Sequence, residues 1–169
     1  MFFFKLQAQQ PGVSFAVSFD LRELKVVRLI ALFEHDAEMV VRENRSTTVR
    51  EAVLDLLRSF GMTTIFGNPG STELPMFRSF PNDFRYVVGL QESAVVGMAD
   101  GFAQATRNAA IVNLHSAVGV GHAMGAIFTA YRNRTPLVLT AGQQARSILP
   151  TEPFLFSMQA TELPKPYVK

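Results

Sequence analysis

The chain has 169 residues, 48% of them hydrophobic and 18% charged, which suits one ordinary globular domain with a buried core. The formal net charge of +2 is too small for the basic face of a nucleic-acid-binding protein, so no nucleic acid partner is expected. Cysteine is absent, which excludes disulfides, thiolate metal sites and a cysteine nucleophile and is compatible with the cytoplasm, where we expect the protein. We find no convincing export signal at residues 1–5 and no apolar run near the ~20 residues that cross a membrane, so no membrane partner is expected.

The pattern of the chain changes near Ser46. Residues 1–46 read as a poorly predicted N-terminal extension with one expected helix at 21–33. An added docking segment and a poorly ordered or non-native extension are both open interpretations of this part. No chemistry is assigned to it.

From position 47 the sequence alternates helical and strand patterns. Thr48 and Glu51 form a capping box, an apolar face follows it, and Gly61 ends the helix. Ser71 follows a turn cluster at 67–70 and is expected to cap a short helix. The same signals predict further elements. Strands are expected at 63–66, 86–90, 109–114 and 136–141, helices at 48–60, 93–107 and 122–133, and a loop at 115–121.

Strands separated by helices of this length cannot pair as hairpins. The sequence therefore predicts an α/β fold, with a parallel sheet covered by helices on both faces. Ligands of such sheets bind beyond the carboxyl ends of the strands. Ser71, Glu92, His115 and Gln143 each follow a different predicted strand, so we expect these four polar side chains to face the same edge of the sheet.

Each of these side chains also has a structural interpretation. Ser71 and Glu92 could serve only as helix caps, His115 could be a hydrogen-bonded structural histidine, and Gln143 could order a loop. Glycines at 119, 121 and 125 follow a strand, but their spacing departs from the dinucleotide-binding fingerprint and no acidic residue lies near position 140. A close-packed loop and helix start explains these glycines better.

Several ordered runs of residues resemble one enzyme family. They are 66–71 (FGNPGS), 73–75 (ELP), 90–92 (LQE), 99–101 (ADG), 114–117 (LHSA) and 141–144 (AGQQ). Together they resemble the thiamin diphosphate-dependent 2-oxo acid decarboxylases of the benzoylformate decarboxylase type. The resemblance covers residues 47–169 and none of residues 1–46. It implies that 47–169 is the pyrimidine-binding domain of such an enzyme.

The resemblance also assigns roles. Glu92 would hydrogen-bond to the aminopyrimidine of thiamin diphosphate, Ser71 would bind the substrate carboxylate, and His115 would relay protons. Pro69, Gly70 and Gln143 would join Glu92 in contacting the cofactor. The single histidine before a serine at 115–116 is similar to enzymes acting on aromatic 2-oxo acids, and the implied reaction converts benzoylformate to benzaldehyde and CO2. His122 departs from the family, whose members usually have asparagine at this position.

The family holds Mg2+ through a Gly-Asp-Gly motif that this sequence lacks, so no metal ligand is expected among these residues. We expect the chain to end inside the pyrimidine-binding domain, with the sheet incomplete at its C-terminus, and to be inactive alone. The intact enzymes would be homodimers or tetramers that act on a small-molecule 2-oxo acid. Two alternatives stay open: a non-enzymatic remnant or interaction module that pairs with a full-length relative, and a carboligase of the acetohydroxy acid synthase type, against which Ser71 and His115 argue.

Overall fold

The computed structural model describes residues 2–3, 48–145 and 147–168. The helix expected at 21–33 lies outside the described residues, and the domain boundary expected after position 46 stays a prediction. The chain separates into two units, Met1–Leu6 with Ala52–Lys169 and, apart from these, Gln7–Glu51. The first unit contains the sheet and the candidate site.

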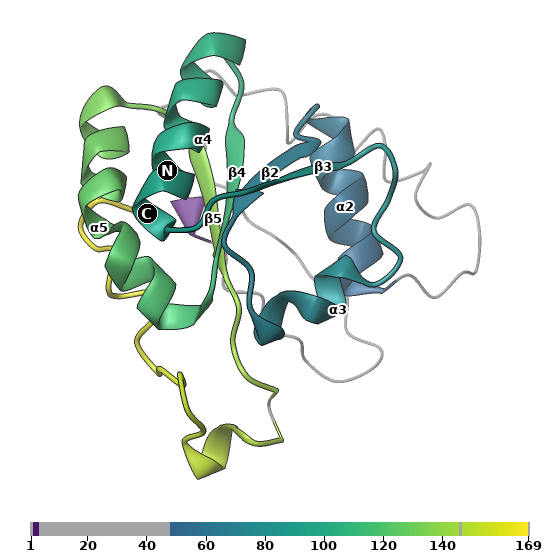
Figure 1. The fold of residues 1–169 in the computed structure, drawn as a ribbon, viewed down its shortest axis with the longest axis vertical. Coiled ribbons are helices and arrows are strands. Elements are labelled where there is room, and N and C mark those ends of the chain that lie inside the picture. Colours follow the sequence, from purple (N-terminus) through teal and green to yellow (C-terminus); the bar gives the residue numbers. More distant parts are fainter. Residues whose placement is uncertain (1, 4–47, 146, 169) are drawn as a thin grey trace, which may run out of the picture. The chain divides into compact units, whose positions relative to one another are not determined.

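The sheet is parallel throughout the described residues, as the sequence predicts. Its strands run in the spatial order β1-β5-β4-β2-β3, and every pair of neighbours is parallel. Figure 1 shows the sheet between its helices. The bounds of the strands are Phe2–Phe3 (β1), Thr64–Gly67 (β2), Arg85–Val88 (β3), Ala110–Leu114 (β4) and Leu137–Ala141 (β5).

The strand order reverses at β2. The chain leaves β2 for β3 on one side and then adds β4 on the other side of β2. The loop after β2 leads to a short helix, α3, on one face of the sheet, whereas the loop after β4 leads to α5 on the opposite face. Diverging loops of this kind leave a crevice beyond the strand ends, which is where open α/β sheets bind their ligands.

Helices cover both faces of the sheet, which confirms the predicted fold class. Figure 1 shows α4 and α5 on one face and α2 and α3 on the other. The helices are α2 (Val49–Ser59), α3 (Leu74–Phe77), α4 (Glu92–Thr106) and α5 (Ser116–Asn133), with 3-10 turns η1 (Ser71–Glu73) and η2 (Leu149–Thr151). Among the described residues, no helix is long and apolar enough to cross a membrane.

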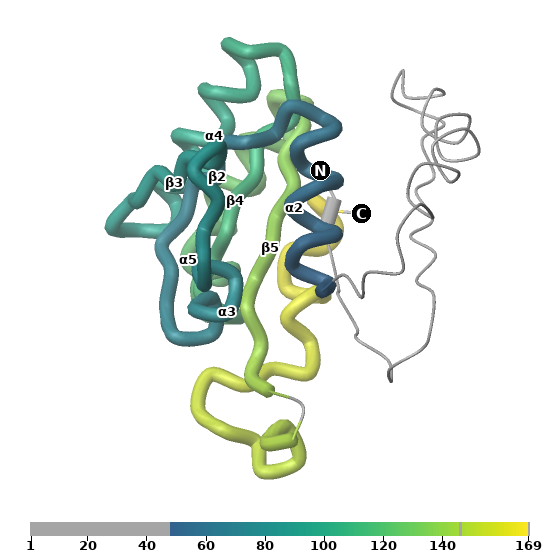
Figure 2. The backbone as a smooth tube through the Cα atoms, turned by 90° about the vertical axis from the view of Figure 1, so that its right-hand side faces the viewer, coloured from purple at the N-terminus to yellow at the C-terminus, as the bar shows by residue number. Residues whose placement is uncertain are grey.

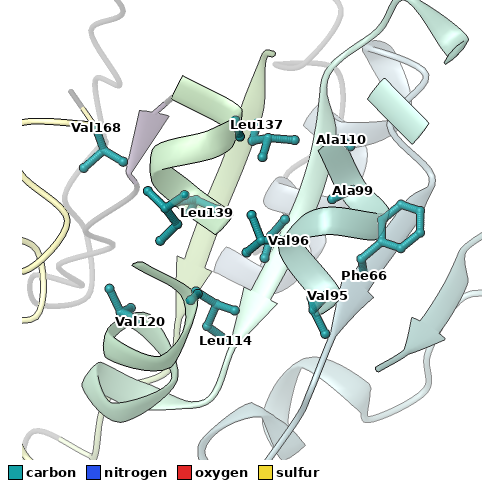
Figure 3. Packing of buried hydrophobic residues seen from close by; sticks show 14 of the residues in the cluster. Phe66, Val95, Val96, Ala99, Ala110, Leu114, Val120, Leu137, Leu139 and Val168 are labelled. Atoms are coloured by element: carbon teal, nitrogen blue, oxygen red, sulfur yellow. The ribbon is translucent and has the colours of Figure 1, made fainter. Parts of the chain in front are cut away.

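Alternate residues of the central strands explain this two-sided packing. In β4, Ala110 and Val112 pack in the same cluster as residues of α4 and α5, whereas Ile111 between them packs with Leu54 and Leu57 of α2. Figure 3 shows the larger cluster, in which Val96 of α4 lies among the side chains of the strands. Each fully buried aliphatic side chain stabilises the fold by about 1.5–3 kcal/mol relative to an exposed one.

The helix predicted at 48–60 has the ends that its sequence indicates. The hydroxyl of Thr48 accepts a hydrogen bond from the backbone N–H of Glu51 at 3.2 Å, and the Glu51 carboxylate accepts one from the Thr48 N–H at 2.8 Å. Gly61 follows the helix with a φ of 65°, the left-handed conformation that glycine adopts without strain. Within the described residues, the predicted capping box and glycine stop are confirmed.

The predicted start of the last helix is wrong by six residues. Residues 115–121 were expected to form a loop, but α5 begins at Ser116 and Gly119 already lies in its first turns. Close packing explains only the first of the three glycines: a Cβ at Gly119 would lie 3.3 Å from Glu92 and 3.4 Å from Leu114, whereas one at Gly121 or Gly125 would meet nothing within 4 Å. A smaller correction applies to β3, which was expected at 86–90 and ends at Val88.

The residues after β5 leave the sheet and return to it. Figure 2 shows this segment, drawn in yellow, looping beyond the end of β5 and turning back. Val168 is buried in the larger core cluster, and the Tyr167 ring meets Phe128 and Tyr131 of α5 with centroid distances of 5.1 and 5.6 Å. The C-terminal segment thus covers part of α5.

Candidate functional site

The four polar residues singled out from the sequence follow four different strands. Ser71 begins the turn η1 after β2, Glu92 begins α4 after β3, His115 precedes α5 after β4, and Gln143 follows β5. Because all four strands are parallel, these positions lie at one edge of the sheet. Contacts between the loops then decide which side chains meet.

Glu92 is buried at the first residue of α4, with only 7% of its surface exposed. It does not serve as the helix cap, because the Gln91 side chain accepts the Ala94 N–H at 3.0 Å and performs that function. Instead, Glu92 Oε1 accepts a hydrogen bond from the Asn68 side chain at 3.2 Å, and Oε2 lies 3.3 Å from Nδ1 of His122. The carboxyl group is therefore held between the loop after β2 and helix α5.

His115 joins the loops that follow β2 and β4. Its Nδ1 lies 2.9 Å from Glu73 Oε2 and 3.1 Å from the Thr72 hydroxyl. A Cβ at Gly70 would overlap the His115 ring, so the backbone of the loop passes directly over the imidazole. The ring is consequently held on two sides by residues that adjoin Ser71.

Glu73 is the buried acidic residue of this cluster, with 3% of its surface exposed. Its Oε2 accepts the Gly70 backbone N–H at 2.7 Å and its Oε1 accepts the Thr72 hydroxyl at 2.7 Å. No role for Glu73 was predicted from the sequence, although it lies three residues after Gly70, the spacing at which an acidic side chain folds back onto a helix start. Ser71 is the first residue of η1 and not its cap as expected, since the residue before the turn is Gly70.

A row of polar side chains crosses the sheet beneath the site. The Tyr86 hydroxyl of β3 donates to Asn113 Oδ1 of β4 at 2.9 Å, and Asn113 donates to the Thr140 hydroxyl of β5 at 3.2 Å. Tyr86 reaches Asn113 by passing over Gly67 of β2, where a Cβ would lie 2.6 Å from the phenol carbon. Burial and the nearby Glu73 carboxylate raise the pKa of Tyr86, so the phenol stays protonated and donates.

The Gln143 side chain forms a hydrogen bond with the C-terminal segment. Its side chain donates to the Ser157 carbonyl at 2.8 Å and accepts the Gln144 N–H at 3.2 Å. In the neighbouring loop position, a Cβ at Gly142 would overlap Glu73 and Thr72. The β5 loop therefore encloses the Glu73 cluster through its backbone, while the Gln143 side chain orders the segment after it.

The buried Glu92 carboxyl group is the part of the site that could hold a ligand. Among the described residues, no group of three or more histidine, aspartate or glutamate side chains is arranged to hold a metal. Glu92 instead offers one buried carboxyl group, with Gly119 leaving no side chain beside it. A buried carboxyl group in such a site can form a directed hydrogen bond to a polar group of a ligand.

Comparison with known proteins identifies the family. Residues 47–162 match the family model of the thiamine pyrophosphate enzymes' N-terminal TPP binding domain. The chain belongs to this family. As such a TPP-binding domain, it is 56% identical over 122 residues to benzoylformate decarboxylase of Pseudomonas aeruginosa, an alignment that covers 72% of this chain and 23% of the relative.

Two further comparisons place this TPP-binding domain among its relatives. The crystal structure of benzoylformate decarboxylase from Polynucleobacter necessarius is 52% identical, with a TM-score of 0.71 over 73% of this chain and 23% of that one. The acetolactate synthase large subunit of Haemophilus influenzae is 30% identical over 106 residues, 62% of this chain and 18% of the relative. The chain thus spans less than a quarter of the length of these relatives.

Proposed function

We propose that this chain supplies the pyrimidine-binding part of a thiamin diphosphate-dependent decarboxylase that converts aromatic 2-oxo acids, with benzoylformate as substrate, to aldehydes and CO2. The observation that carries the proposal is the buried Glu92 carboxyl group at the strand edge, beside the loop that holds His115. The 56% identity to a benzoylformate decarboxylase supports the substrate class.

Glu92 would hold the cofactor by a hydrogen bond from its carboxyl group to the aminopyrimidine ring. Bound thiamin diphosphate supplies the electron sink that the loss of CO2 requires. Asn68 keeps one Glu92 oxygen in place, while the other is approached by the largely exposed His122 ring. Pro69 and Gly70, on the same loop as Asn68, would line the cofactor site through their backbone, and Gln143 would close it from the β5 loop.

Ser71 and His115 would serve the substrate. Ser71 is exposed at the start of η1, beside Leu74, Pro75 and Arg78, which line a shallow hollow with it. A hydroxyl at this position would bind the substrate carboxylate. His115, held by Thr72 and Glu73, would take up and return a proton at the reacting carbon.

The intact enzyme would need parts beyond these residues. We propose that Mg2+ is bound through ligands outside the described residues, that two or four copies assemble, and that the enzyme acts in the cytoplasm. Alone, the chain is expected to be inactive. A carboligase of the acetohydroxy acid synthase type is the second candidate, which the 30% identity to an acetolactate synthase favours less than the 56% identity to a decarboxylase.

A hybrid enzyme tests the proposal. Residues 47–168 would replace the matching part of the Pseudomonas aeruginosa benzoylformate decarboxylase, and release of CO2 and aldehyde from benzoylformate and from pyruvate would be measured. We expect activity on benzoylformate, and a loss of ~100-fold or more in kcat/KM in the Glu92→Gln hybrid, since a positioned acid or base contributes about that much.

Exposed Glu152 provides the matched control, because Glu152→Gln should leave the activity of the hybrid unchanged. A hybrid that folds with the circular dichroism spectrum of the parent but decarboxylates neither acid would refute the proposal. Formation of acetolactate from pyruvate, with no aldehyde from benzoylformate, would favour the carboligase.

A further inference from the structure

His115 has two ring nitrogens, and the two lie in different surroundings. Nδ1 contacts both Glu73 Oε2, at 2.9 Å, and the Thr72 hydroxyl oxygen, at 3.1 Å. Glu73 is almost fully buried, whereas 24% of the His115 side chain is exposed. The Nδ1 edge of the ring thus faces the protein.

The position of the proton on the ring follows from counting donors and acceptors. Glu73 already accepts the Gly70 N–H at Oε2 and the Thr72 hydroxyl at Oε1. Both oxygens of the carboxyl group thus act as acceptors, and Oε2 presents an acceptor to Nδ1 of His115. The Thr72 hydroxyl already donates its one hydrogen bond to Glu73. Its oxygen can therefore only accept a hydrogen bond from His115.

Both neighbours of Nδ1 are therefore acceptors. A neutral imidazole carries a proton on only one of its two nitrogens. Here Nδ1 must carry it, because an unprotonated Nδ1 would point its lone pair at the lone pairs of two oxygen atoms. We infer that Glu73, with Thr72, is a positioning residue that fixes His115 in the Nδ1–H tautomer and leaves Nε2 as the nitrogen that exchanges protons. The inference rests on the proposed function for the use of Nε2, whereas the tautomer itself does not depend on it.

The loops around the cluster explain why this arrangement is rigid. The Gly70 backbone lies over the His115 ring, and the backbone at Gly142 lies against Glu73 and Thr72, so that a Cβ at either glycine would overlap them. Glu73 cannot swing away, because it also holds the Gly70 N–H on the loop after β2. The carboxylate therefore connects the loops after β2 and β4 and orients the ring at the same time.

Nuclear magnetic resonance of the full 169-residue chain tests the tautomer without cofactor or substrate. Long-range correlations between ring protons and ring nitrogens distinguish Nδ1–H from Nε2–H imidazoles. The chain has three histidines, and the His115 signals would be assigned with a His115→Gln variant. We expect neutral His115 in the Nδ1–H form; the Nε2–H form, or the mixture of a free imidazole, would overturn the inference.

Glu73→Gln then tests the role of the carboxylate, because the amide has the same shape but can donate as well as accept. We expect this variant to lose the preference for Nδ1–H, whereas Glu162→Gln, at an exposed glutamate paired with Lys165, should keep it. An unchanged His115 spectrum in Glu73→Gln would contradict the assigned role. The wild-type spectrum decides the tautomer even where Glu73→Gln does not fold.

The hybrid enzyme separates this inference from the proposed function. There, Glu73→Gln should lower kcat roughly tenfold or more and change KM by less than about twofold, as expected when a proton-transfer group is misoriented and binding is retained. A change confined to KM would contradict a positioning role. An inactive wild-type hybrid together with the Nδ1–H tautomer would refute the proposed function and leave the tautomer standing.

Discussion

At the scale of single residues, Gly67 shows how the site constrains the sequence. An added Cβ would lie 2.9 Å from the Asn113 carbonyl oxygen and would overlap the Tyr86 phenol. We expect Gly67→Ala to displace Tyr86, leave buried Asn113 Oδ1 without its donor, and lower the free energy of unfolding by about 2–4 kcal/mol. Urea unfolding of the full chain measures this loss.

Gly125 is the matched control for this prediction. It lies on an exposed part of α5, where an added Cβ would meet nothing within 4 Å. Gly125→Ala should therefore raise the free energy of unfolding by about 0.5–1 kcal/mol, because alanine favours the helix. Equal effects of the two substitutions would show that the crossing of Tyr86 over Gly67 does not constrain position 67.

The same scale shows which site residues the sequence could predict. Ser71, Glu92 and His115 were found because each follows a strand, and position after a strand is visible in a hydrophobic pattern. Glu73 was missed because its importance comes from burial against the loops after β4 and β5, which lie about 40 and 70 positions away in the chain. Long-range contacts of this kind leave no periodic signal.

At the scale of elements, a hydrogen bond from the last residue of α5 to Asp100, in the middle of α4, connects the two helices. Asp100 of α4 accepts from Gln104 and from Asn133, the last residue of α5, each at 2.9 Å. Burial alone would raise the pKa of Asp100, but hydrogen bonding by the side chains of Thr135, Gln104 and Asn133 outweighs it and the pKa lies below its ordinary value. The ionised form of Asp100 is thus more stable in the folded chain than in the unfolded one.

We expect Asp100→Asn to lower the free energy of unfolding by about 1–3 kcal/mol at pH 7. Because the folded pKa is depressed, the stabilisation is present above the unfolded value near ~3.9 and disappears as the pH falls through the folded pKa. Urea unfolding at pH 7 and near pH 3 should show the gap between wild type and variant closing. Asp55→Asn, at an exposed ion pair with Arg58, should change little at either pH, and a pH-independent gap for Asp100→Asn would contradict the assignment.

Elements were predicted well where local chemistry sets their ends and poorly where packing does. The capping box at Thr48 and the glycine at 61 fix α2 locally. The start of α5 depends on Ser116, which is buried with a φ of 59°, and on Gly119 packing against Glu92. Glycine and serine after a strand read as a loop, because their close contacts are not visible in the sequence.

At the scale of the whole molecule, the alternation of strands and helices was enough to predict a parallel α/β sheet. The placement of β2 between β3 and β4 was not predicted, since alternation does not say on which side the next strand is added. That placement makes β2 and β4 neighbours and brings the loops bearing Glu73 and His115 together. The site thus depends on a property of the sheet that no single segment carries.

The outer faces of α4 and α5 lead to a prediction about assembly. These helices pack against each other, yet Met98 and Val118 keep 37% and 46% of their surface exposed. Exposed apolar side chains of this kind favour association of copies. In sedimentation, we expect the weight-average mass of the chain to rise above 18.7 kDa with concentration, and the doubly substituted Met98→Lys, Val118→Lys chain to remain at the monomer mass.

Ile148→Lys, at an exposed residue just before η2, should leave the association unchanged, because a charge there lies off both helices. A wild-type chain that stays monomeric at every concentration would show that these faces do not bind one another and that assembly depends on other surfaces.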